Sequence, residues 1–154
     1  PLHRWLKYKL FCAKFIRKYR EKKMFTGIMN DEEKEKFLEL IFKTATCDGE
    51  YADEEKELIS SYMMELNLSE IKDTATIQEL IDYFANKPLI LQKIVCFEMY
   101  GMIMADEMIE KDEERIMNCM KKKFKLETDD FDSIILVANK LKKIYDEIYT
   151  VIYG

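Results

Sequence analysis

Glycine and proline are scarce in this chain, with four and two residues among 154. Both residues mark turns and strand ends, while leucine, isoleucine, methionine, lysine and glutamate are plentiful, so an all-helical fold is expected. No apolar run reaches the roughly 18 residues that a membrane-spanning helix needs, and the basic, mixed first residues are unlike a signal peptide. The sequence therefore predicts a soluble, all-α protein.

Histidine and paired cysteines are lacking as well. His3 is the one histidine, and no C-x-x-C pair occurs. Neither a Ser-His-Asp set nor a glycine-rich phosphate loop is found, so no enzyme is predicted. Widely spaced cysteines among apolar neighbours are typical of reduced, buried thiols in a cytosolic protein. The four cysteines are Cys12, Cys47, Cys96 and Cys119.

Charge is divided unevenly along the chain. Residues 1–23 hold nine Lys and Arg against one Glu, a net charge of +8, and the remainder holds 16 Lys and Arg against 29 Asp and Glu, a net charge of −13. Three interpretations of residues 2–23 stay open: the first helix of a bundle packed on the core, a helix on an anionic membrane surface, or a nucleic-acid contact, which the acidic remainder disfavours. In each case an amphipathic helix is expected, with an apolar stripe of Trp5, Tyr8, Cys12, Phe15, Ile16 and Tyr19.

An internal repeat organises the remainder, because the pattern of residues 44–68 returns 58 residues later in residues 102–126. Asp48 corresponds to Asp106 and Glu55 to Glu113, and the apolar positions between them keep their register. Each Asp is expected to end one helix and each Glu to begin the next. We therefore predict an all-α bundle of about seven helices, built around two pseudo-repeated helical hairpins.

Capping residues and apolar stripes define the expected helices. Asn30 and Glu33 form a capping box, Pro88 opens the helix expected to be the most buried, and Thr128 caps the last helix. A basic arm and connection, residues 1–30, precede a helical domain of residues 31–154. The expected helices cover approximately residues 2–23, 31–48, 52–66, 76–85, 88–106, 110–124 and 128–152.

Asp48, Glu55, Asp106 and Glu113 are candidate metal ligands. A carboxylate in the last turn of a helix faces the negative end of the helix dipole, which costs about 0.3 to 1 kcal/mol, and the pattern places one there twice. If the two hairpins face each other, the four carboxylates meet and need a divalent cation such as Ca²⁺, Mg²⁺ or Mn²⁺, basic side chains or shared protons. The alternative is structural, with each acid bonding backbone N–H groups of its own turn or helix.

Two segments, ATCDGEYADEEKELI (residues 45–59) and IMADEMIEKDEERIM (residues 103–117), resemble the two motifs of the TerB and TerB-like family, named from tellurite resistance. The resemblance covers about residues 31–152. It implies an all-α domain of about seven helices, no established enzymatic activity, and an acidic site for a divalent metal ion at the four acids. Family members are associated with metal or chemical stress and with assemblies at the inner face of the bacterial membrane.

Three positions depart from the family pattern. Glu107 stands where the family often has glycine, and Ala52 and Glu110 stand where it often has Ser or Thr. The expected function is a non-catalytic module that binds a divalent metal and docks on proteins in a membrane-proximal, cytoplasmic complex, with a peripheral contact between residues 1–23 and anionic lipid. The alternatives are a carboxylate-bridged, metal-dependent hydrolase or redox enzyme, and a metal-free interaction scaffold.

Overall fold

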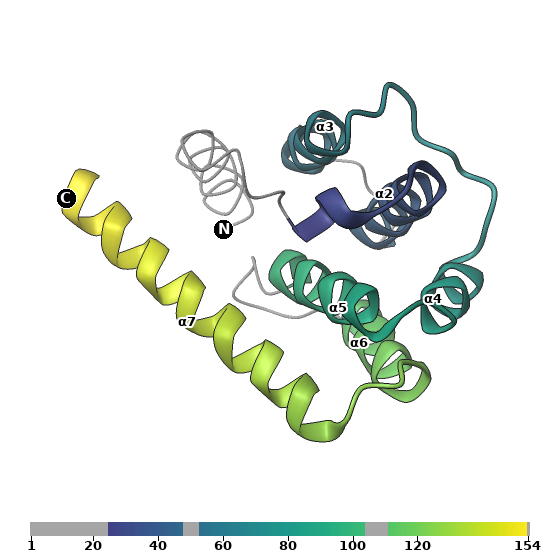
Figure 1. Cartoon of the computed structure of the whole chain (residues 1–154). Helices are drawn as coiled ribbons and strands as arrows, with labels where there is room; N and C mark the ends of the chain where they lie inside the picture. Colours follow the sequence, from purple (N-terminus) through teal and green to yellow (C-terminus); the bar gives the residue numbers. More distant parts are fainter. Residues whose placement is uncertain (1–24, 48–52, 104–110, 154) are drawn as a thin grey trace.

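A computed structural model describes residues 25–47, 53–103 and 111–153, without the side chains of Glu54 and Glu55. Over these ranges the chain forms six α-helices and one short 3-10 turn and contains no strand, which confirms the all-α prediction (Figure 1). The expected helix over residues 2–23 lies outside the described residues. The elements are η2 (Phe25–Ile28), α2 (Asp31–Ala45), α3 (Asp53–Leu66), α4 (Ile77–Ala85), α5 (Leu89–Ile103), α6 (Lys111–Lys123) and α7 (Thr128–Tyr153).

Helix α5 is the most buried helix, as its apolar sequence predicts. Ten of its 15 residues are buried. It packs against α4, α6 and α7, while α2 packs against α3 and α4 (Figure 1). The prediction that Pro88 is the first residue of this helix is wrong by one residue, because α5 begins at Leu89 and the carbonyl of Pro88 accepts from the N–H groups of Leu91 at 2.9 Å and Gln92 at 3.2 Å. A helix that is apolar on several sides needs neighbours on several sides, and α5 has them.

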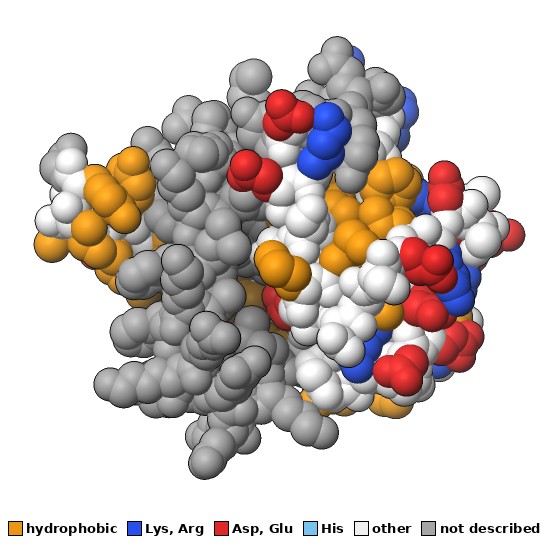
Figure 2. Space-filling view, turned by 90° about the horizontal axis from the view of Figure 1, so that it is seen from above, with side chains coloured by type: hydrophobic (Ala, Val, Ile, Leu, Met, Phe, Trp, Pro, Cys, Tyr) orange, Lys and Arg blue, Asp and Glu red, His pale blue; other side chains and the backbone are white. Residues whose placement is uncertain are grey.

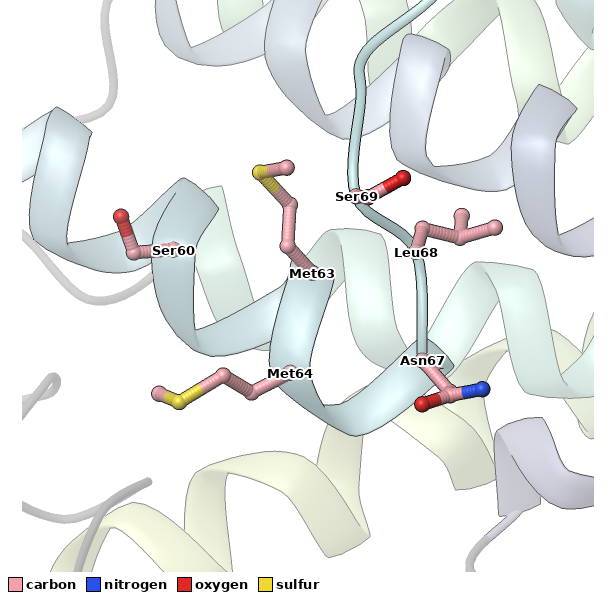
Figure 3. Close-up of a pocket in the computed structure, with 6 residues that line it drawn as sticks. All are labelled: Ser60, Met63, Met64, Asn67, Leu68 and Ser69. Carbon is pink, nitrogen blue, oxygen red and sulfur yellow. The ribbon is translucent and has the colours of Figure 1, made fainter.

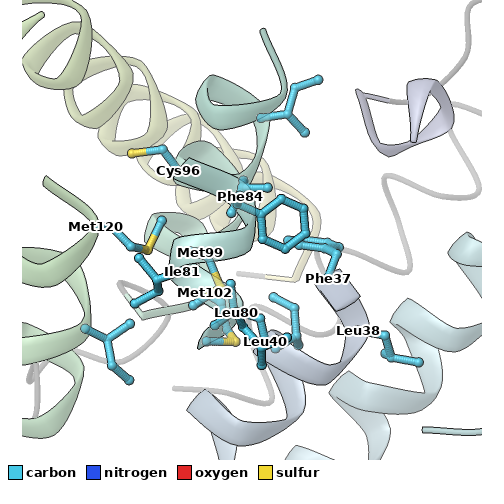
Figure 4. Close-up of a cluster of buried hydrophobic side chains, with 14 of the residues drawn as sticks. Phe37, Leu38, Leu40, Leu80, Ile81, Phe84, Cys96, Met99, Met102 and Met120 are labelled. Atoms are coloured by element: carbon cyan, nitrogen blue, oxygen red, sulfur yellow. The ribbon is translucent and has the colours of Figure 1, made fainter. Parts of the chain in front are cut away.

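The core is built around Phe37 on α2. Its ring meets the ring of Tyr62 on α3 edge-on, with 5.9 Å between centroids, and the ring of Phe84 on α4 in the same way at 6.4 Å. All three side chains are fully buried, and methionines from α5 and α6 belong to the same hydrophobic cluster (Figure 4). Edge-to-face pairs add about 0.5 to 1.5 kcal/mol to the burial of the rings. Phe37 thus joins the first three described α-helices.

The predicted helix starts are mostly confirmed. Asn30 caps α2 in a capping box, where its side chain accepts from Glu33 N–H at 2.9 Å and Glu33 accepts from Asn30 N–H at 3.0 Å. Thr76 and Glu79 form a second capping box at the start of α4. The prediction that Thr128 caps α7 is wrong by one residue, because the carbonyl of Glu127 accepts the first helical bond, from Phe131 N–H, and Thr128 already lies in the helix.

Helix α3 ends in a Schellman motif. Leu68 N–H donates to Met63 O at 2.9 Å, and Asn67 has a φ of 57°, in the left-handed region that asparagine tolerates better than most residues. We expect Asn67→Ala to lower the free energy of unfolding by about 1 kcal/mol. Asn67→Gly should leave it nearly unchanged. Urea unfolding of the three proteins checks this, and equal midpoints for alanine and asparagine would contradict it.

No helix within residues 25–47, 53–103 or 111–153 combines the length and the hydrophobicity that crossing a bilayer requires.

Candidate functional site

The predicted metal ligands fall largely outside the described residues. Asp48 and Asp106 belong to ranges that the structure does not describe, and Glu55 lies in the first turn of α3 without a described side chain. Glu113 is described, in the first turn of α6, and is half-buried while its neighbour Glu114 is exposed. The described residues contain no group of three His, Cys, Asp or Glu side chains that could hold a metal ion. Since three of the four acids are not among those side chains, the metal site stays a prediction.

The end of α2 differs from the prediction. Asp48 was expected in the last helical turn, but α2 ends at Ala45 and Thr46 is its C-cap. Thr46 donates two hydrogen bonds to Phe42 O, from its N–H at 3.1 Å and from its hydroxyl at 2.9 Å. The next residue, Cys47, donates its N–H to Thr44 O. Threonine hydroxyls compete with the helical ladder in this way and favour its termination. The described helix thus ends three residues before the predicted end at Asp48, and Asp48 itself lies outside the described residues.

A buried polar cluster that the sequence analysis missed joins α3 and α5. Tyr62 on α3 is fully buried and donates its hydroxyl to Glu98 on α5 at 3.2 Å. One turn further along α3, Glu65 accepts the hydroxyl of Thr26 in η2 at 2.8 Å. Glu98 is only 9% exposed, although it carries a carboxylate. Its position inside the apolar sequence of α5 was the signal that could have revealed it.

The electrostatics of this cluster keep the phenol of Tyr62 neutral. Burial, together with the nearby charges of Glu98 and Glu65 and the hydrogen bond to Glu98, raises the pKa of Tyr62 well above its usual value. Tyr62 therefore remains a neutral donor at physiological pH. Glu98 and Glu65 each accept a hydrogen bond from a hydroxyl group, which offsets part of the cost of removing a carboxylate from water.

The cysteines in the described ranges are free thiols. Cys96 lies in the core, and burial raises the pKa of its thiol to about 12, so it stays protonated at neutral pH. Cys119 is half-buried on α6, and its sulfur lies 3.1 Å from Gln78 Oε1 on α4. The prediction of a buried, reduced thiol is confirmed for Cys96, while Cys47 and Cys119 are half-buried and Cys12 is outside the described residues.

An open depression of about 730 Å³ lies beside the C-terminal part of α3 (Figure 3). Its polar atoms come from serine and asparagine side chains, and it contains no titratable group. The lining therefore offers surface to a ligand and no acid, base or nucleophile. The residues are Ser60, Met63 and Met64 on α3, and Asn67, Leu68 and Ser69 after it.

Comparisons with known proteins find no similar protein. Family models, curated proteins and solved structures show no significant match to this chain.

Proposed function

We propose that this chain is a non-catalytic, TerB-like helical module that holds a divalent cation between its two acidic loops and docks on protein partners near the cytoplasmic membrane. The ligands in this proposal are Asp48, Glu55, Asp106 and Glu113. Oxygen-only ligands suit Ca²⁺, Mg²⁺ or Mn²⁺. The cation would stabilise one relative position of the two loops, and so one shape of the docking surface.

A recurrence of helix boundaries supports this proposal more than any other observation. The first residue of α5, Leu89, lies 58 residues after the first residue of α2, Asp31. The sequence repeat has the same offset. Duplicated chains keep such boundaries when they keep their fold. In this proposal the two loops that carry the predicted acids connect equivalent pairs of helices.

The packing partners agree with two related halves. Helix α2 packs against the two helices that follow it, α3 and α4, and α5 packs against the two that follow it, α6 and α7. Glu113 is half-buried in the first turn of α6, although the acids on either side of it are exposed. A first-turn acid that turns inward in this way has the orientation that the proposed site requires.

Calorimetric titration of the full chain with Ca²⁺, Mg²⁺ and Mn²⁺ tests the proposal. We expect one of these ions to bind, and we expect Asp48→Asn and Asp106→Asn each to weaken binding by about tenfold or more, since one charged ligand contributes at least about 1.4 kcal/mol. Glu113→Gln should weaken it similarly.

Glu114→Gln is the matched control, because it removes the same charge from an exposed position beside Glu113. If the control weakens binding as much as Glu113→Gln, the affinity is nonspecific attraction to an acidic surface. If no ion binds, the metal role is wrong and a metal-free scaffold is the better description. Thermal unfolding with and without chelator gives an independent measure, since a ligand bound to the native state raises the midpoint.

A further inference from the structure

Helix α7 lies at one edge of the described helices and packs against α5 (Figure 1). Lys93 of α5 pairs with Asp130 of α7 at 2.8 Å. Further along the same two helices Asn139 donates to Tyr100 at 3.1 Å, so both helices advance in the same direction. By this register the last described residue of α5 is level with residue 142. Figure 1 shows the rest of α7 reaching away from the other described helices.

An exposed apolar stripe follows α7, next to the buried side that carries Phe131 and Ala138. Its members are alternately three and four residues apart, which is the a and d repeat of a coiled coil. Val137 is 55% exposed, Ile144 51% and Val151 85%, so most of the stripe is open to solvent. Figure 2 shows hydrophobic side chains gathered at the C-terminal end of α7, at the left of the view. The stripe consists of Ile134, Val137, Leu141, Ile144, Ile148 and Val151.

The spacing of this stripe indicates which kind of partner it fits. A contiguous apolar surface of this length is normally covered by a partner. An a and d repeat fits another helix with the same repeat, because the side chains of each helix insert between those of the other. A second copy of α7 has that repeat by definition. Two identical helices that run antiparallel form a closed, two-fold symmetric pair.

We propose that this chain forms a two-fold symmetric dimer in which the α7 helices of two copies pack antiparallel along this stripe. Leu141 lies against the partner's Ile144, and Lys140 pairs with the partner's Glu147. The occupant of the stripe is thus a second copy of the same chain. The dimer does not depend on the proposed metal site, and its failure would leave that site untouched.

The apolar layers of this dimer are complete. In an antiparallel pair each a position meets a d position of the partner, so Leu141 lies opposite Ile144 on both sides of the two-fold axis. All the side chains of the stripe are branched and aliphatic, and none of them carries a polar atom that would have to leave water. The outer layers join Val137 to the partner's Ile148 and Ile134 to the partner's Val151.

Charged residues beside the stripe favour the same alignment. Lys140 and Glu147 are both exposed, one heptad apart, on the side of the stripe that is turned away from Ala138. In the proposed alignment each Lys140 lies opposite the partner's Glu147, and symmetry gives two such pairs. Sliding one helix by a heptad in either direction brings Glu147 opposite Glu147 or Lys140 opposite Lys140, which is repulsive. A parallel pair brings neither residue beside an opposite charge, so the charges select both the register and the direction.

Size and position also suit a dimer. The two-fold axis would lie between residues 142 and 143, and the described part of α5 is level only with the half of α7 before it. The described parts of the two α5 helices therefore lie at opposite ends of the helix pair. At the roughly 30 Å² per residue of typical interfaces, about 15 residues of each α7 would bury roughly 1,000 Å² in total. This area suits a reversible dimer with a dissociation constant in the micromolar range.

Sedimentation velocity of the full chain tests the proposal over a concentration range of about 1 to 500 μM. We expect the sedimenting species to change reversibly from one chain to two as the concentration rises. Ile144→Asp places two carboxylates at the centre of the stripe and should weaken the dimer at least about a hundredfold. Leu136→Asp is the matched control, because Leu136 is 54% exposed on another side of α7 and receives the same charge. It should leave the dissociation constant nearly unchanged.

Exchanging the two charges tests the register without changing the apolar stripe. Glu147→Lys gives both pairs like charges and should weaken the dimer about tenfold, and Lys140→Glu should do the same. The double variant Lys140→Glu/Glu147→Lys restores both pairs with their signs exchanged, so the affinity should return. These changes are at exposed positions, and this measurement therefore does not depend on a variant with a disturbed core.

Three results would contradict the proposed dimer. A chain that remains monomeric at the highest concentration would overturn the proposal. A dimer that Ile144→Asp leaves intact would place the interface on another surface and would overturn it as well. If Glu147→Lys weakens the dimer and the double variant does not restore it, the antiparallel pairing of Lys140 with Glu147 is wrong.

Discussion

Replacing Glu39 by alanine is expected to lower the free energy of unfolding by about 3 to 5 kcal/mol, because it leaves two backbone N–H groups at a partly buried site without an acceptor. Glu39 lies in the middle of α2 and is fully buried. Its Oε1 accepts from the N–H of Ala75 at 2.7 Å and from the N–H of Thr74, and its Oε2 accepts from Lys36 Nζ at 3.3 Å. One carboxylate thus holds the segment between α3 and α4 against α2.

Glu39→Gln keeps the shape of the side chain and removes its negative charge. The amide oxygen can still accept from the two N–H groups, so the expected loss is smaller, about 1 to 2 kcal/mol. Urea unfolding at neutral pH measures both variants. The control is Glu35→Ala on the same helix, which breaks a half-exposed ion pair with Lys72 and should cost less than about 1 kcal/mol. Similar losses for Glu35→Ala and Glu39→Ala would show that the carboxylate does not hold the segment.

The dependence of the free energy of unfolding on pH should also reflect the ionisation of Glu39. Burial alone would raise the pKa of Glu39, but hydrogen bonds from Ala75 and Thr74 and the charge of Lys36 outweigh it and lower that pKa. A carboxyl whose pKa is lower in the folded state stabilises the fold above its unfolded pKa of about 4.3, and this contribution is lost as the pH falls through the folded value. Glu39→Gln should therefore lose less stability on acidification than the unmodified protein.

The sequence predicted those parts of the fold that follow from local chemistry. Asn30 and Glu33 are three residues apart at the start of an amphipathic stripe, which is enough to identify a capping box. The uninterrupted apolar run after Pro88 similarly identified the most buried helix. Both features depend on residues close together in the chain, so the pattern alone could reveal them.

Contacts between distant segments were not predictable in this way. Glu98 and Tyr62 are 36 residues apart, and Glu39 and Ala75 are also 36 apart, so the local pattern does not identify the partner of either acid. A charged residue within an apolar helix indicates a buried polar contact but does not name its partner. The four predicted metal ligands present the same difficulty, because their meeting depends on how the two hairpins pack.

At Gln92 on α5 the opposite change, the introduction of a buried charge, can be tested. It is buried, its Nε2 donates to the carbonyl oxygens of Lys87 at 2.7 Å and Ala85 at 3.2 Å, and its Oε1 accepts from Lys125 N–H at 2.7 Å. One amide thus joins the turn before α5 to the segment after α6. Gln92→Glu keeps the shape but turns a donor into a charged acceptor facing two carbonyl oxygens. At neutral pH we expect a loss of about 3 to 5 kcal/mol, as for an uncompensated buried charge.

The pH profile of Gln92→Glu should run opposite to that of Glu39. Facing acceptors in a buried site, the new carboxyl would have a folded pKa above its unfolded value of about 4.3, because the protonated form can donate to Lys87 O. Relative to the unmodified protein, the variant should therefore regain stability as the pH falls from the raised pKa towards about 4.3. Urea unfolding between neutral and acidic pH measures this, with Gln78→Glu, at an exposed position on α4, as the control. A pH-independent loss would mean that the introduced charge reaches solvent, and that the amide of Gln92 does not join the two segments as its hydrogen bonds indicate.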